Sequence, residues 1–423
     1  MTRPTPARLF LRNAAQLITL AGWPAPRRRA ALGELAIIPR GGLLTEGETI
    51  LRTGPSRSLE AQAIRLRAQA IDCQGRVVMP GFVDSHTHLI FAGSRVDDYD
   101  RRLRGKTYEE IAQAGGGIQS SAEKLRKASP ASLQRQAEDF LRQFAAHGTT
   151  TVEVKSGYGL EIEQELKMLR VIRSLRASTP LDLVPTLLAA HALPASFRGR
   201  AAQYVEEVVR RLIPAVAEQK LAEFIDCFCD RGAFSVEDCR RVLAAGKQLG
   251  LEPRIHAEQL TRTGATRLGM ALGAASADHL DKLSGADIHA LAHSNVVATL
   301  LPGANFHLGL KQYPPARQLI AAGAAVALAT DFNPGTSPTL NMQFIMSLAC
   351  TQMRMTPAEA IAASTINGAF SLRRADRVGS LEAGKQADII VLDVSDYREI
   401  PYYFAVNHCV MTVKGGRMIY WRA

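Results

Sequence analysis

The hydrophobic pattern of the chain changes twice. Up to about Met79, short apolar runs are broken by turns, as in RLFLRN, AQLITL and ETILRTG. After Pro80, short apolar segments alternate with long amphipathic ones. Beyond residue 372, GSLEAGKQADIIVLDVSDY and HCVMTVKGGRMIYW return to short runs around glycine turns. Short apolar runs bounded by turn residues are typical of strands, so both ends of the chain are predicted to be β-rich.

The middle segment contains eight strand candidates, which are GFVDSH, TTTVEV, LDLVPTLL, AEFIDCF, LEPRIH, AASADH, NVVATL and AVALAT. Helical patterns separate them. Ile162, Leu166, Leu169 and Ile172 form one apolar stripe, and the segment that begins at Ser235 has a capping-box spacing. An alternation of strand and helix repeated eight times predicts an α/β fold, a (β/α)8 TIM-type barrel.

We expect the barrel to span residues 80–372. The β-rich ends, residues 1–79 and 373–423, are predicted to join into one small β-sandwich domain beside it.

The amino-acid composition, with 47% hydrophobic and 22% charged residues, is that of an ordinary globular protein. Charges interrupt every apolar run, so no membrane association is expected, and the start of the chain lacks the pattern of a secretory signal. Six cysteines in 423 residues are too few for a disulfide framework, which favours the reducing cytoplasm.

The net charge of +11 raises the question of a nucleic-acid partner. The basic residues are spread in patches such as PRRRA and RRLRGK, without interleaved aromatic residues or zinc-finger spacing. We therefore expect no nucleic-acid binding, and a basic surface that favours a carboxylate substrate.

Chemistry-bearing side chains gather at the predicted strand ends, where the active sites of such barrels lie. Five of the ten histidines fall there, and an aspartate closes the last strand. They are His86, His88, His191, His256, His279 and Asp331.

Four of these residues are predicted to hold a metal ion. His86 and His88 are two apart in a strand, so they point to one side. Together with His256 and Asp331 they offer the imidazole and carboxylate ligands of a catalytic site that keeps a position for water. We predict one ion per chain, because the fourth strand ends without a lysine that could bridge a pair. Lys155 is assigned a structural role, and Zn²⁺ and Fe³⁺ are both compatible with this ligand set.

A bound cation would activate water, and the reaction would also need proton transfer. His279 is the main candidate for the proton-transfer residue, and Asp331 is a second one. The alternative for His279 is a residue that only orients a ligand.

The motifs PGFVDSHTH, HAEQL, SADHL, ATDFNPG and GSLEAGKQADIIVLD resemble the amidohydrolase superfamily. Within it, FAGSR, KSGYGL, AHALP and TDFNPGTSP are most similar to the branch that acts in histidine degradation. The resemblance implies hydrolysis of the cyclic amide 4-imidazolone-5-propanoate to N-formimidoyl-L-glutamate by metal-activated water. It also implies the ligands His86, His88, His256 and Asp331.

The same resemblance implies a substrate site. It assigns substrate contacts to Arg95, Tyr158, His191, Asn333, Gly335 and Thr336. An arginine suits a propionate because its planar fork can bind a carboxylate through two hydrogen bonds.

One position departs from the pattern. Many relatives have glutamate three residues after the fifth-strand histidine, where this chain has Gln259. Glutamine can orient a ring nitrogen but cannot carry a proton, so Gln259 is assigned to the catalytic site as a substrate-binding residue. The proton would then be carried by Glu258, His279 or Asp331.

Two other functions are compatible with the same motifs. The first is deamination, or hydrolysis of another cyclic amide or amidine, on the same metal site. The second is a non-catalytic barrel that has lost its metal ion and serves as an assembly or binding protein.

We also expect a lid at residues 95–117, where glycines could act as hinges. From the superfamily alone, we expect a homodimer.

Overall fold

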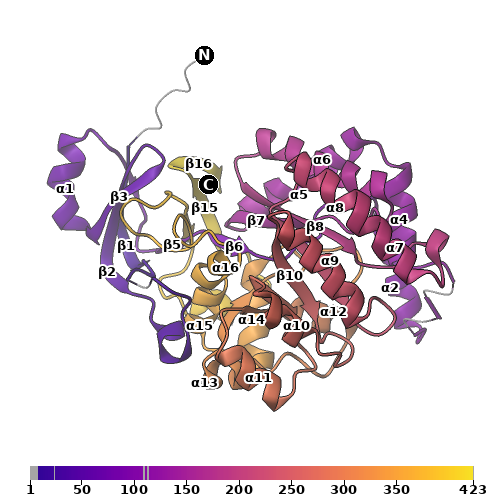
Figure 1. Ribbon diagram of the computed structural model, residues 1–423. Helices are drawn as coiled ribbons and strands as arrows, with labels where there is room; N and C mark the ends of the chain where they lie inside the picture. Colours follow the sequence, from indigo (N-terminus) through magenta and orange to yellow (C-terminus); the bar gives the residue numbers. More distant parts are fainter. Residues whose placement is uncertain (1–7, 23, 108–109, 112–113, 423) are drawn as a thin grey trace.

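Two eight-stranded sheets organise the chain and correspond to its two hydrophobic patterns (Figure 1). They are seen in a computed structural model that describes residues 8–22, 24–107, 110–111 and 114–422. Parts of the predicted lid, residues 108–109 and 112–113, and the first seven residues of the predicted N-terminal domain lie outside the described residues.

The first sheet is the predicted barrel. Its strands pair in parallel, each with the next along the chain. All eight predicted strands are present, in the predicted order, and the prediction of a (β/α)8 barrel is confirmed. The strands are β6 (Phe82–Asp84), β7 (Thr149–Lys155), β8 (Asp182–Ala190), β9 (Phe224–Cys229), β10 (Glu252–Ala257), β11 (Ser276–His279), β12 (Val297–Leu300) and β13 (Ala325–Leu328).

Backbone hydrogen bonds close the barrel between its first and last strands. The N–H of Asp331 donates to the carbonyl of His86 at 3.0 Å, and that of His88 donates to Phe332 at 2.8 Å. The residues that follow β6 and β13 are therefore held side by side, although they lie far apart in the sequence.

Helices cover the outside of the barrel. Three members of the predicted stripe on α6 (Ile162–Ser178), Leu166, Leu169 and Ile172, are buried, and the fourth, Ile162, is partly buried. Ser235 and Asp238 form the predicted capping box of α9 (Val236–Gln248). The helices are α2 (Val96–Leu103), α4 (Gly117–Lys127), α5 (Pro130–Ala146), α6 (Ile162–Ser178), α7 (Ala201–Glu207), α8 (Ile213–Glu218), α9 (Val236–Gln248), α10 (Ala265–Leu272), α11 (Gly285–Ala292), α12 (Pro302–Leu308), α13 (Ala316–Ala322), α14 (Met342–Met353), α15 (Pro357–Ala363) and α16 (Ile366–Ser371). Short helical turns are η1 (Arg29–Gly33), η2 (Ala195–Phe197) and η3 (Val208–Leu212).

The second sheet joins the two ends of the chain, as predicted, and lies beside the barrel in Figure 1. Its strand order is β16-β15-β14-β5-β1-β2-β3, with β4 also paired to β1. The join is the antiparallel pair of β5 and β14. The strands are β1 (Leu9–Ile18), β2 (Ile37–Glu46), β3 (Thr49–Pro55), β4 (Gln69–Asp72), β5 (Val77–Pro80), β14 (Ile389–Leu392), β15 (Cys409–Lys414) and β16 (Arg417–Trp421).

Two helices in this part were not predicted. Helix α1 (Ser56–Arg65) packs Leu59 and Ala63 against Phe10 and Leu44, so a short apolar stripe suffices for it. The short helix α17 (Glu399–Tyr402) precedes β15. No helix of the described part of the chain has the length and apolar character needed to cross a membrane.

Candidate active site

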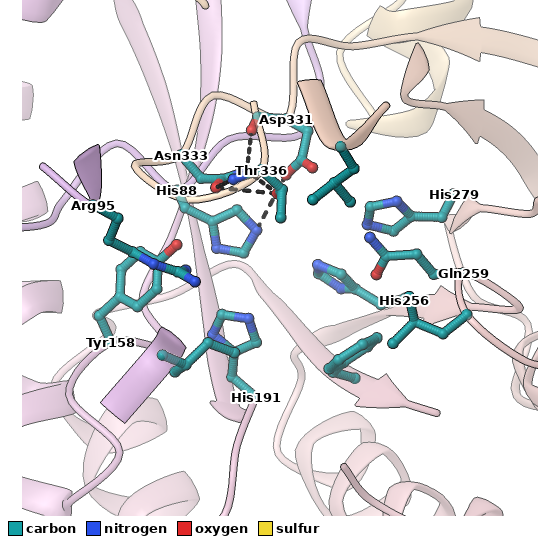
Figure 2. A pocket seen from close by; sticks show the side chains of 14 residues that line it. His88, Arg95, Tyr158, His191, His256, Gln259, His279, Asp331, Asn333 and Thr336 are labelled. Carbon is teal, nitrogen blue, oxygen red and sulfur yellow. Dashed lines mark hydrogen bonds and ion pairs between the residues drawn. The ribbon is translucent and has the colours of Figure 1, made fainter. Parts of the chain in front are cut away.

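A pocket opens at the carboxyl ends of the barrel strands and gathers most of the predicted site (Figure 2). Of the predicted residues, it is lined by His88, Arg95, Tyr158, His191, His256, Gln259, His279, Asp331, Asn333 and Thr336. The side chain of His86 is completely buried, and Gly335 lies against Arg95. Four apolar residues, Ile118, Phe228, Leu260 and Leu308, also line the pocket and were not predicted.

The predicted metal ligands converge. Asp331 Oδ1 lies 3.6 Å from His86 Nε2 and 3.5 Å from His88 Nε2. Two atoms that each bind one ion at about 2.1 Å in a tetrahedral shell are about 3.4 Å apart, so these separations fit a shared cation. The ring centroids of His86 and His256 are 4.5 Å apart. His279 joins His86 and His256 in a second group whose ligand atoms lie within 4.8 Å of one another.

The tautomers of two histidines also fit a cation. The Nδ1 of His86 lies 2.7 Å from a carboxylate oxygen of Asp278, and the Nδ1 of His256 lies 3.0 Å from one of Asp226. A carboxylate next to Nδ1 keeps the proton there and leaves the lone pair on Nε2. Both Nε2 atoms are buried and have no hydrogen-bond partner among the described residues. The contact of His256 Nδ1 with Asp226 is an ion-pair distance without hydrogen-bond alignment. The residues present therefore fit a metal ion.

Charge in the site agrees with this assignment. Burial, followed by the positive charge of Lys155, holds the pKa of His86 well below its ordinary value. Burial and His191 do the same for His88, so both rings are neutral, as metal ligands must be. Burial raises the pKa of Asp331 well above its ordinary range, and a bound cation would oppose that shift by favouring the carboxylate.

A layer of buried charges lies beneath the predicted ligands, and of its five members only Lys155 was singled out in the sequence. It consists of Glu153, Lys155, Asp226, Arg254 and Asp278, all with completely buried side chains. In the sequence, these carboxylates interrupt otherwise apolar strands, and that interruption is the pattern from which the buried charges could have been predicted. The strand pattern alone did not show which of them face the barrel interior.

Two site residues adopt left-handed backbone conformations where their strands end. His279 has φ +78° and Asp331 has φ +54°, conformations that cost free energy for residues other than glycine and that cluster at functional sites. Burial, followed by His256, holds the pKa of His279 well below its ordinary value. Its ring is therefore neutral and can accept a proton.

The guanidinium of Arg95 enters the pocket from the loop after the first strand (Figure 2). Its Nε donates to Asp98 Oδ2 at 3.0 Å, and the same oxygen accepts the N–H of Gly117 at 2.9 Å. A Cβ atom at Gly335 would lie only 2.1 Å from Nη1 of Arg95. Arg95 is therefore fixed by a carboxylate on one side and by a position that only glycine leaves open on the other.

Tyr158 and His191 stand on the same side of the pocket as Arg95 in Figure 2. His191 Nδ1 lies 2.8 Å from the carbonyl of Gly157, and the ring stacks on His88 with centroids 5.2 Å apart. Burial, followed by His256, lowers the pKa of His191 to about 3. It is thus a neutral ring whose Nδ1 is engaged, which leaves Nε2 for a ligand.

The loop of Asn333 holds itself together. Asn333 Oδ1 accepts the N–H groups of Gly335 and Thr336 at 2.8 and 2.7 Å, and its Nδ2 donates to the carbonyl of Asp331 at 2.6 Å. The side chain of Asn333 therefore shapes the turn after the metal ligand. Direct substrate contacts from Asn333, Gly335 and Thr336 stay predictions.

Gln259 and Glu258 face different ways. Gln259 lines the pocket, whereas Glu258 is 1% exposed and accepts the N–H groups of Gly264 and Thr266 at 2.8 and 2.9 Å. Glu258 therefore holds the start of α10, and proton transfer is left to His279 or Asp331.

This geometry, a parallel barrel whose strand ends carry histidines and an aspartate able to bind a metal ion, is typical of a class of metal-dependent hydrolases. Residues 77–419 match the model of the amidohydrolase family, and the chain belongs to that family.

Curated relatives indicate which branch of the amidohydrolase family the chain resembles. The chain is 46% identical to an imidazolonepropionase of Geobacillus kaustophilus over 414 residues, which is 97% of either chain. It is 45% identical to that of Solibacter usitatus over 413 residues, 98% of this chain and 99% of the relative. This likeness places it among the imidazolonepropionases of the family.

Solved structures that resemble the chain are more distant. A triazine hydrolase from Arthrobacter aurescens has a TM-score of 0.75 at 17% identity, covering 98% of this chain and 95% of the other. Guanine deaminase from E. coli has a TM-score of 0.72 at 16% identity, covering 99% and 100%. At such identities the likeness shows the fold alone.

Proposed function

We propose that the protein hydrolyses the ring amide of 4-imidazolone-5-propanoate to N-formimidoyl-L-glutamate in histidine degradation, with one Zn²⁺ or Fe³⁺ per chain. The observation that carries the proposal is that the guanidinium of Arg95 and the ligand group of His88, His256 and Asp331 line one pocket. A carboxylate at one end and a ring carbonyl at the other would each meet its complement there.

The side of the pocket opposite the metal site binds the propionate and positions the ring of the substrate. Arg95 keeps its terminal nitrogens for the ligand because its Nε is used by Asp98, so the fork can bind both carboxylate oxygens. Tyr158 and His191 are placed beside it to contact the ring, and Gln259 lies across the pocket, where its amide can orient a ring nitrogen.

A cation held by His86, His88, His256 and Asp331 would lower the pKa of a bound water and polarise the ring carbonyl. The oxygen of water adds to that carbonyl carbon, the bond from the carbon to the ring nitrogen breaks, and the nitrogen takes up a proton. His279 or Asp331 accepts the proton of the water. Because burial and His256 hold the pKa of His279 low, a protonated His279 would release its proton readily to the leaving nitrogen.

One experiment tests whether the enzyme prefers this substrate to a similar ring that has no anionic tail. Metal content is measured by elemental analysis, and turnover is followed by the ultraviolet absorbance of freshly made 4-imidazolone-5-propanoate. We expect about one ion per chain, turnover that is lost on chelation and restored by metal, and at least about tenfold lower kcat/KM for the propionamide analogue, since a charged hydrogen bond contributes about 1.5–3 kcal/mol. Equal turnover of the two compounds, or preferential deamination of guanine, would overturn the proposal.

We place the reaction in the cytoplasm, because all six cysteines are free thiols and thiols persist in a reducing compartment. The homodimer and the absence of a nucleic-acid partner stay predictions.

A further inference from the structure

The ammonium group of Lys155 lies at the centre of the buried charges beneath the metal ligands. Its Nζ is 2.8 Å from Glu153 Oε1, 2.8 Å from Asp226 Oδ2 and 4.0 Å from Asp278 Oδ2. Burial opposes the charge of this lysine, but Asp226 and Glu153 outweigh it and raise the pKa of Lys155. The lysine is therefore a fixed positive charge inside the barrel.

Each of the three carboxylates also holds one part of the ligand framework. Asp226 contacts Nδ1 of His256 at 3.0 Å, and Asp278 contacts Nδ1 of His86 at 2.7 Å. Glu153 accepts the backbone N–H of Thr87 at 3.0 Å. Since Thr87 stands between His86 and His88, that bond fixes the segment that carries both ligands.

We propose that Lys155 is a positioning residue that sets the metal affinity of the site. It binds the carboxylates that orient His86, His88 and His256, and it acts on these rings through them. This inference rests on the proposed metal centre but does not depend on the proposed substrate.

The reason is electrostatic. Among the described residues, Lys155 and Arg254 are the two cations that form ion pairs with these three carboxylates, and Arg254 contacts only Asp278 among them, at 3.2 Å. Without the ammonium group, the carboxylates would repel each other and move apart. A displaced Asp226 or Asp278 would no longer contact Nδ1 of its histidine, and loss of such a partner typically weakens metal binding 10- to 100-fold.

The chain offers a matched control at the opposite end of the barrel. Lys414 is also a buried lysine between two carboxylates, 2.7 Å from Asp182 and 2.6 Å from Asp388. Asp182 is the first residue of β8, whereas the proposed metal ligands lie at or just after the carboxyl ends of their strands. Lys414→Met should therefore cost stability in a similar way without acting on the metal site.

The test is the dissociation constant of the full-length apoprotein for Zn²⁺, measured by competition with a chromophoric chelator. We expect Lys155→Met to raise that constant about 10- to 100-fold and Lys414→Met to leave it unchanged. An unchanged constant in Lys155→Met, or an equal rise in both variants, would overturn the role of Lys155. Failure of the wild-type protein to bind Zn²⁺ would instead remove the metal centre itself.

A second variant keeps the inference testable if Lys155→Met does not fold. Lys155→Gln retains an amide donor for the carboxylates but removes the charge, and it is measured in the same way. The visible spectrum of the Co²⁺-loaded protein gives an independent readout, because its bands depend on ligand geometry. We expect the bands to shift in Lys155→Gln and not in Lys414→Met, and identical spectra in all three proteins would contradict the proposal.

Discussion

The two sides of the pocket are built in different ways. On the side proposed to bind the metal ion, His86, His88 and Asp331 follow the ends of barrel strands and His256 is the penultimate residue of β10. Buried carboxylates contact Nδ1 of His86 and of His256. On the substrate side, Arg95 and Tyr158 stand on loops that follow the strands. The carboxylate of Asp98 accepts a hydrogen bond from Arg95, and the guanidinium occupies space that a side chain at Gly335 would fill.

The comparison indicates that the barrel fixes the positions of the metal-binding side chains, whereas the group that binds the substrate depends on a loop. A metal site needs several ligand atoms at defined separations, and strand ends in a closed barrel supply them. A substrate tail needs one complementary group, and a loop can exchange it without disturbing the barrel. The distant hydrolase and deaminase structures share the fold at 16–17% identity.

Breaking the metal side should give the largest effect. We expect His256→Ala to lose the metal ion and to reduce kcat/KM by more than about 1000-fold, because a catalytic cation contributes several kcal/mol to the transition state. Elemental analysis of the purified variant and the absorbance assay check the two parts together. A variant that keeps full metal content and activity would show that His256 is not a ligand.

Breaking the substrate side should give a smaller effect of another kind. Arg95→Met removes the charge but keeps an unbranched side chain, and the loss of a charged hydrogen bond of about 1.5–3 kcal/mol predicts a 10- to 100-fold lower kcat/KM, mostly through KM. Metal content should not change. The propionamide analogue serves as the control, since Arg95→Met should hardly alter its turnover, and an equal loss with both compounds would argue against carboxylate binding by Arg95.

The same contrast explains how much the sequence could predict. All eight barrel strands, and the gathering of His86, His88, His256 and Asp331 near their carboxyl ends, follow from local pattern, because His86 and His88 are two residues apart and strand ends meet at one rim. Helix α1 was missed because its apolar stripe is too short to distinguish it from the surrounding β pattern.

Contacts between distant segments could not be predicted in this way. Asp226 and Asp278 belong to strands whose inward faces become known only when the barrel is closed. The direction of Glu258, away from the pocket, depends on its left-handed backbone, with φ +49°. The proximity of Gly335 to Arg95 arises from the packing of two loops after β6 and β13, and no local pattern contains it.

The smallest expected effect concerns that packing. Gly335→Ala would place a Cβ 2.1 Å from Nη1 of Arg95, so the flexible end of the arginine must move. We expect a cost of about 1 kcal/mol in substrate binding, or about a fivefold rise in KM, with metal content unchanged. Gly285→Ala is the control, because a Cβ there meets nothing within 4 Å. The decisive measurement is the double variant with Arg95→Met. If Gly335 acts only by leaving room for the guanidinium, Gly335→Ala should have no further effect on KM once that group is gone. A full fivefold rise in that background would assign Gly335 a role of its own in binding the substrate.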